Sequence, residues 1–272
     1  MCRGSLCPGG GDDNDMTEQE AVRMRELEEE NRQLKTALNN REEFIRDTVR
    51  RYLSDEVLEE ILQNNESIKI GGERKVVTIM FSDLRRSTEL SEQMDAGDFI
   101  IMLNHYLEEM IEIVNAWQGN ILSFVGDAIV CVFGAPRANT YAARDAVACA
   151  VSMQRRMAAV NNWNTEHGFP EISMGIGIHT GEAILGNIGS QTRTKYDMIG
   201  RNVNLASRIE GFTEGGQILI STETRNDAGE KVVFDEDSAR WVRPKGIQED
   251  ILLHSVVGFG KQHLRCEEQV NG

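Results

Sequence analysis

The sequence predicts an α+β protein in which a ferredoxin-like βαββαβ domain follows an N-terminal helical coiled coil. Residues 16–62 contain no glycine or proline and are dense in Glu, Arg, Leu and Gln, which indicates long helices. Gly71-Gly72 ends that composition, and segments with strand and helix periodicity then alternate along the chain. Their order (strand, helix, strand, strand, helix, strand) is the split βαβ pattern.

The overall composition limits the class of function. The chain has 272 residues, of which 40% are hydrophobic, and its formal net charge is −15. The apolar fraction excludes wholesale disorder, and the acidity argues against a nucleic-acid binder because phosphate backbones require clustered Lys and Arg. The acidity is compatible with a nucleotide bound through a metal ion, since carboxylates hold the cation.

The predicted compartment is the cytoplasm. No apolar run approaches the ~18 residues of a membrane span, and the first residues lack the apolar core of a secretory signal. The five cysteines are an odd number without metal-ligand spacing, and Cys131 and Cys149 lie in apolar stretches. We therefore expect these two to be small buried hydrophobes in a reduced compartment.

The N-terminal part divides into two segments. Residues 1–15 are rich in Gly and Asp and are expected to be disordered, whereas residues 16–52 fit a heptad repeat. The heptad places Met24, Asn31, Leu38, Ile45 and Tyr52 at a, and Leu27, Leu34, Arg41 and Thr48 at d. A polar residue at a, here Asn31, sets the register of parallel dimers. Because the flanking positions are almost all charged, we favour a dimeric coiled coil over a single amphipathic helix packed on its own domain.

The remaining elements follow in order. A short helix with Ser54 as its N-cap and a linker are expected over 53–74, the main domain over 75–257, and a polar tail over 258–272. Within the main domain we expect strands at 76–81, two between 120 and 133, and at 172–178, 217–221 and 251–257, with helices at 99–117, 140–163 and 202–212.

Two aspartates follow strands of the predicted sheet. Asp83 comes directly after the apolar strand that ends at Phe81, and Asp127 follows Gly126 in a hairpin turn between two apolar runs. Taken singly, each aspartate would also be explained by a structural role in a turn or at a helix N-cap. Neighbouring strands can, however, bring both carboxylates to one edge of the sheet, where they would share divalent cations.

A second candidate pair lies on the predicted helix 202–212. Asn204 and Arg208 are one turn apart, beside the apolar stripe of that helix. An amide and a guanidinium at this spacing can hold a ribose oxygen and a phosphate together, although a plain surface pair has the same spacing.

From about Lys75 to Val257 these segments resemble the class III nucleotidyl cyclases, the adenylate and guanylate cyclase catalytic domain. The motifs that carry the resemblance are Thr78–Leu84 (TIMFSDL), Phe124–Ala128 (FVGDA), Gly175–Gly181 (GIGIHTG), Gly186–Gly189 (GNIG) and Tyr196–Arg208 (YDMIGRNVNLASR). Their common order and spacing make the resemblance specific. The preceding helix resembles the signalling helix and transducer that precede many bacterial members.

The resemblance implies a role for each matched residue. Asp83 and Asp127 would hold two Mg²⁺ or Mn²⁺ ions, with the Leu84 carbonyl as a candidate further ligand. Asn204 would orient the ribose, and Arg208 would stabilise the transition state as the 3′-hydroxyl attacks the α-phosphate. In this family the carboxylates and the Asn/Arg pair of one site come from different chains, so the resemblance implies a homodimer.

Two further positions of the resemblance concern the base. Asp197 would accept a hydrogen bond from the adenine 6-amino group and repel the guanine 6-oxo group. Ser123 stands where adenylate cyclases often carry a Lys and guanylate cyclases a Glu, so we expect ATP to be the preferred substrate, with imperfect discrimination. A guanylate or mixed-specificity cyclase is the alternative.

Other positions depart from the family pattern or match it weakly. Arg86 and Ser87 replace a Gly-Phe pair near the triphosphate, and Arg201 replaces an acidic residue. Lys245 resembles a family lysine that contacts the triphosphate, although a surface lysine would also fit.

Two other classes of function remain as alternatives. One is a catalytically silent module that dimerises or binds a regulator, against which the presence of both aspartates, Asn204 and Arg208 argues. The other is a nucleic-acid binder on the same fold, against which the acidic charge argues. Since residues 1–15 hold no sensor, we expect an upstream sensor domain or a regulatory partner to supply the activating signal.

Overall fold

The computed structural model describes residues 13–50, 53–54, 57–59, 62, 70–247 and 249–264. The chain divides into two compact units, Met1–Leu53 and Ser54–Gly272. Among the described residues, no helix is long and apolar enough to span a membrane.

The first unit is the helix α1 (Asp13–Arg50). It begins inside the range 1–15 for which we expected disorder; that expectation is wrong for residues 13–15, because acidic residues favour the first turn of a helix. Arg32 and Glu29 form an ion pair at 2.6 Å along its surface. The predicted seam residues Met24, Leu34 and Leu38 are exposed, and the predicted a position at 52 lies outside the described residues.

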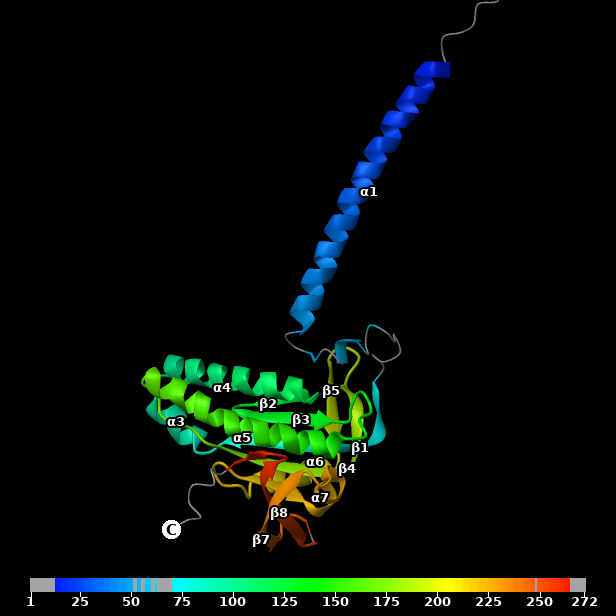
Figure 1. Ribbon diagram of the computed structural model, residues 1–272. Helices are drawn as coiled ribbons and strands as arrows, with labels where there is room; N and C mark the ends of the chain where they lie inside the picture. The colour runs from blue at the N-terminus through cyan, green and yellow to red at the C-terminus, as the bar shows by residue number, and fades with distance from the viewer. Residues whose placement is uncertain are drawn as a thin grey trace, which may run out of the picture. The chain divides into compact units, whose positions relative to one another are not determined.

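The second unit is built on a mixed sheet with helices on both faces (Figure 1). Its strands are β1 (Gly71–Leu84), β2 (Asn120–Val125), β3 (Ala128–Phe133), β4 (Met174–Gly189), β5 (Thr194–Ile199), β6 (Ile218–Ser221), β7 (Val232–Val242), β8 (Ile251–Phe259) and β9 (Gln262–His263). Its helices are α3 (Ser87–Gln93), α4 (Ala96–Ala116), α5 (Ala142–Glu166), α6 (Arg201–Glu210) and α7 (Thr222–Ala228).

The strand order confirms the predicted fold class. The sheet runs β2-β3-β1-β4-β6-β8-β7, with β5 paired to β4 and β9 to β8. The part β2-β3-β1-β4 is the ferredoxin-like arrangement, in which β1 lies antiparallel between β3 and β4. The parallel pairing of β4 with β6 extends this sheet toward β8 and β7.

Several predicted boundaries need correction. Strand β1 starts at Gly71, inside the expected linker 53–74, and β8 and β9 occupy part of the expected tail 258–272. The helices α3 and α7 and the strands β5 and β7 were not expected. Polar segments such as the start of β1 form strands because a neighbouring strand satisfies their backbone groups: Gly71 pairs with Asn187 of β4.

The two faces of the sheet carry different helices. Helices α4, α5 and α7 cover one face, over a core that includes Met80, Ile129 and Ile178. Helix α6 lies on the other face, where Ala206 packs near Ile79. Cys131 and Cys149 are fully buried free thiols, as predicted, and burial raises the pKa of Cys131 to about 12.

Glycines of β4 let α6 approach the sheet closely. A Cβ at Gly177 would lie 2.1 Å from the backbone N of Glu210, and one at Gly175 would lie 1.8 Å from Thr213 Oγ1. The intervening Ile176 points into the opposite core, because side chains alternate along a strand. The GIGIHTG motif therefore has isoleucines on the face of the strand toward the core and glycines without side chains on the opposite face. Helix α6 packs on the glycine face.

Candidate active site

Asp83 and Asp127 come together at one end of the sheet. Asp83 is the penultimate residue of β1, and Asp127 lies in the turn between β2 and β3, where Gly126 adopts φ 65°. The antiparallel pairing of β1 with β3 brings this turn beside the end of β1. The two carboxyl groups lie close enough for the charge of Asp127 to act on Asp83, and Asp127 Oδ2 accepts a hydrogen bond from Leu84 N at 3.1 Å.

The environment of this pair favours a bound cation. Burial, together with the charge of Asp127, raises the pKa of Asp83 to about 7, so the doubly ionised pair is unfavourable in the protein alone. Among the described residues there is no cluster of three or more His, Cys, Asp or Glu side chains placed to hold a metal ion. Two carboxylates nevertheless fit Mg²⁺, which takes few protein ligands and completes its shell with water and substrate phosphates.

Arg85 and Glu210 adjoin this pair, and sequence reasoning did not identify them as site residues. Arg85 pairs with Glu210, and its Nη2 lies 3.5 Å from Asp83 Oδ2. Burial raises the pKa of Glu210, and the charge of Arg85 opposes that rise. Glu210 lies on the predicted helix 202–212, but no spacing rule pairs it with a residue as distant in sequence as Arg85.

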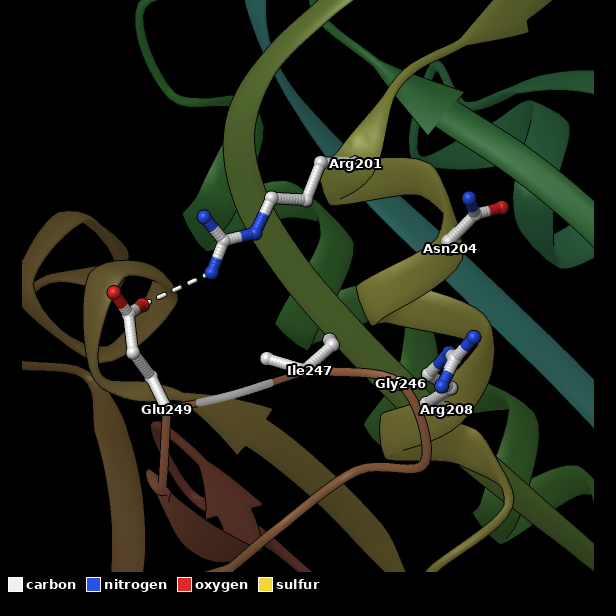
Figure 2. Close-up of a pocket in the computed structure, with 6 residues that line it drawn as sticks. All are labelled: Arg201, Asn204, Arg208, Gly246, Ile247 and Glu249. Atoms are coloured by element: carbon white, nitrogen blue, oxygen red, sulfur yellow. Dashed lines mark hydrogen bonds and ion pairs between the residues drawn. The ribbon is translucent and has the colours of Figure 1, made fainter.

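Asn204 and Arg208 line a separate pocket of about 380 Å³ (Figure 2). Its lining residues are Arg201, Asn204, Arg208, Gly246, Ile247 and Glu249. The Nη1 atom of Arg208 is buried without a hydrogen-bond partner, and a Cβ at Gly246 would lie 3.5 Å from it. An unpartnered guanidinium donor in a pocket is suited to an anionic group. Arg201 donates to Glu249 at 2.9 Å across the same pocket (Figure 2).

Helix α6 directs the side chains of Arg208 and Glu210 to different sides. Arg208 and Glu210 are two residues apart, so they project about 200° apart around the helix axis. Glu210 accordingly meets Arg85 beside the carboxylates, while Arg208 faces the pocket. The residues that line the pocket include neither Asp83 nor Asp127. Within the part of the chain that the structure describes, this pocket therefore holds Asn204 and Arg208 without the two carboxylates.

The predicted base-contacting residues lie elsewhere. Ser123 is partly exposed on β2, next to an irregularity in the pairing with β3. Asp197 lies on β5, where Oδ2 accepts from Lys195 Nζ at 2.9 Å and Oδ1 from Met198 N at 2.9 Å. Lys245 is exposed beside the pocket but does not line it.

The departure at Arg86 has a local structural role. Its backbone is left-handed, with φ 62°, at the N-cap of α3. Its side chain pairs with Glu89 at 2.7 Å.

Comparisons with known proteins agree on one family. Residues 72–255 match the family model described as "Adenylate and Guanylate cyclase catalytic domain". The chain is 33% identical over 198 residues to "Adenylate cyclase 1" of Rhizobium meliloti (strain 1021), an alignment that covers 71% of this chain and 30% of that protein. The chain thus spans about a third of the length of the curated relatives it matches.

Solved structures of a guanylyl cyclase and of an adenylyl cyclase are both similar to this chain. The crystal structure of the guanylyl cyclase Cya2 matches with a TM-score of 0.70 and 41% identity, over 72% of this chain and 100% of that one. The crystal structure of the adenylyl cyclase CyaB from P. aeruginosa matches with a TM-score of 0.67 and 34% identity, over 71% of this chain and 99% of that one.

Proposed function

The chain belongs to the adenylate and guanylate cyclase catalytic-domain family, and we propose that it converts ATP to 3′,5′-cyclic AMP and pyrophosphate. One observation carries the proposal: the chain offers a half-buried pair of carboxylates, Asp83 and Asp127, and an unpartnered guanidinium at Arg208. The first fits divalent cations and the second fits a phosphate. We propose that the protein acts in the cytoplasm, in agreement with its buried free thiols.

Each group has a defined part in the proposed reaction. Two Mg²⁺ or Mn²⁺ ions at Asp83 and Asp127, with the Leu84 carbonyl as a further ligand, would lower the pKa of the ribose 3′-hydroxyl and polarise the α-phosphate. Asn204 holds the ribose so that the 3′-oxygen faces the α-phosphorus in line with the leaving oxygen. Arg208 donates to the phosphoryl oxygens as negative charge builds on them. The new 3′-O–P bond replaces the bond to pyrophosphate, and the hydroxyl proton passes to water.

We propose that each site is shared between two chains. The separation of the carboxylates from the pocket of Asn204 and Arg208 within one chain supports this arrangement. A homodimer related by two-fold symmetry then has two equivalent sites, each with carboxylates from one chain and the Asn/Arg pair from the other. The exposed seam of α1, with Met24, Leu34 and Leu38, gives a second copy an apolar stripe to cover.

The preference for ATP rests on Asp197. Its carboxylate accepts hydrogen bonds, so it matches the adenine amino group and opposes the guanine oxo group. Lys195 competes for the same carboxylate, and Ser123 provides a weaker contact than a lysine would. The 41% identity to a guanylyl cyclase structure favours guanylate or mixed specificity as a second candidate.

The test is product analysis with ATP and GTP, each with Mg²⁺ and with Mn²⁺. We expect cyclic AMP as the main product and a smaller rate of cyclic GMP formation. If cyclic GMP is the main product, the preferred substrate is GTP and not ATP, and the proposed cyclisation reaction still holds. If neither cyclic nucleotide forms under any of the four conditions, the silent-module alternative is supported instead.

Removal of residues 1–52 is expected to make activity depend on protein concentration. Because shared sites exist only in the dimer, and the coiled coil raises the dimer population, the truncated protein should lose specific activity on dilution and recover it at high concentration. The measurement is specific activity across a dilution series, beside the full chain. Equal specific activity for the truncated protein at all concentrations would show that the helix does not supply dimerisation.

The N-terminal part of the chain bears on how the activating signal reaches the catalytic domain. We propose that it comes from an upstream sensor domain or a regulatory partner, since the chain spans about a third of the length of its curated relatives. Helix α1 is the element that would transmit it, because it precedes the catalytic domain in the chain.

A further inference from the structure

Arg85 connects the end of β1 to the end of α6. Its backbone N donates to Ser173 O at 2.8 Å, which continues the pairing of β1 with β4. Its side chain then crosses above Gly175, where a Cβ would lie 3.3 Å from the guanidinium carbon. Beyond that glycine, the guanidinium forms an ion pair with Glu210 and donates to Thr213 O at 3.3 Å. A side chain at position 175 would block this path.

The same guanidinium also contacts Asp83. Its Nη2 donates to the backbone O of Asp83 at 3.2 Å and lies 3.5 Å from the carboxylate Oδ2. One nitrogen of Arg85 thus serves both Asp83 and Glu210. The guanidinium therefore bridges a proposed metal ligand and the last residue of α6.

The ion pair is shielded from water, unlike the surface pairs of this protein. The side chains of Arg85 and Glu210 are 21% and 12% exposed, whereas those of Arg201 and Glu249 are 65% and 76% exposed. When an ion pair is shielded from water, removal of one partner leaves the charge of the other poorly compensated. The energetic cost of this removal is far larger than for an ion pair at the surface. The charge that would remain after loss of Glu210 lies beside Asp83.

We infer that the Arg85–Glu210 ion pair is a positioning link that holds the carboxylate Asp83 and the helix bearing Arg208 in one fixed relation. Glu210 is two residues beyond Arg208 in the last turn of the same short helix, so a shift of the C-terminal end of α6 at Glu210 also moves Arg208. The inference rests on the proposed function. With shared sites, Asp83 of a chain serves one site and Arg208 of that chain serves the other, so the link joins the two sites of the dimer.

The test compares Glu210→Gln, Arg85→Gln and the double variant in the full chain. Mn²⁺ affinity is measured by calorimetry, and kcat and KM are measured with ATP. Glu210→Gln leaves Asp83 as the carboxylate beside the Arg85 charge, so this charge competes more strongly with the cation and we expect Mn²⁺ affinity to fall about tenfold. Arg85→Gln removes a competing cation, so Mn²⁺ affinity should rise.

Turnover is expected to respond differently from metal affinity. Both single variants should lower kcat by about tenfold to a hundredfold at saturating Mn²⁺, with KM for ATP changed less than about twofold, because misplacement of Arg208 is felt in the transition state. The double variant should be no slower than the slower single variant, since each substitution breaks the same link. Glu214→Gln, an exposed acid four residues beyond Glu210, is the matched control and should match the wild type.

Three results would overturn the inference: Mn²⁺ affinities that shift in the same direction, rate losses that multiply in the double variant, or a Glu210→Gln protein that behaves as the control does. If Glu210→Gln fails to fold, Arg85→Lys decides instead, with wild-type Mn²⁺ affinity and a kcat between those of wild type and Arg85→Gln expected. Failure of the proposed function can be distinguished from failure of this inference. The opposite shifts of Mn²⁺ affinity in Glu210→Gln and Arg85→Gln are measured by binding alone and need no turnover.

Discussion

Asp83→Asn is expected to abolish cyclic nucleotide formation while the protein remains folded. The substitution keeps the shape of the side chain and removes one of two carboxylates proposed to bind the cations. Because charge stabilisation by such groups contributes a large part of the rate, kcat should fall by about a thousandfold or more. Asp127→Asn should behave in the same way. Activity near that of the wild type in either variant would make the metal assignment wrong.

Thermal unfolding of the metal-free protein shows whether the loss of activity comes from unfolding. Burial and Asp127 raise the pKa of Asp83 from 3.8 to about 7, so the native state holds this proton more tightly than the unfolded state does. Ionisation of Asp83 therefore destabilises the native state progressively as pH rises from about 4 to about 7. Asp83→Asn removes this cost, so the variant should gain stability over the wild type between pH 5 and pH 8. Asp237→Asn, at an exposed position of β7, should show no such gain.

Two inactive chains are expected to restore activity when they pair. Asp83→Asn removes the carboxylate half of a site, and Arg208→Ala removes the guanidinium half. In a heterodimer one site collects both substitutions and the other collects neither, because its carboxylates come from the Arg208→Ala chain. Random pairing puts about half of the dimers in the heterodimeric form, so activity should recover to about a quarter of the wild-type value per chain.

The control for this experiment uses two variants of the same half. Chains with Asp83→Asn and Asp127→Asn leave no intact site in any pairing, so their mixture should stay inactive. The chains should be co-expressed with different affinity tags, since a coiled coil can exchange strands slowly. If verified heterodimers of Asp83→Asn and Arg208→Ala are as inactive as the parents, each site belongs to a single chain.

Much of the candidate site could be predicted from the sequence because its residues lie in locally recognisable settings. Asp83 lies at the end of a strand rich in β-branched residues, Asp127 follows a glycine in a hairpin turn, and Asn204 and Arg208 are one helical turn apart. Hydrophobic periodicity also predicted the core strands and the helices α4, α5 and α6. It missed β5 and β7, because edge and outer strands have polar faces and acquire their structure from the pairing with β4 and β8.

Other features were decided only by the tertiary structure. The contact of Arg85 with Glu210 joins residues that are distant in sequence, and it exists because bare glycines of β4 let α6 lie directly on the sheet. The raised pKa of Asp83 depends on the burial and the second carboxylate that the fold brings to it. The sequence by itself determined which chemical groups the chain carries and the order of its main strands and helices, since these depend on residues close together along the chain. The tertiary structure decided which groups meet, because packing and desolvation arise only when distant segments come into contact.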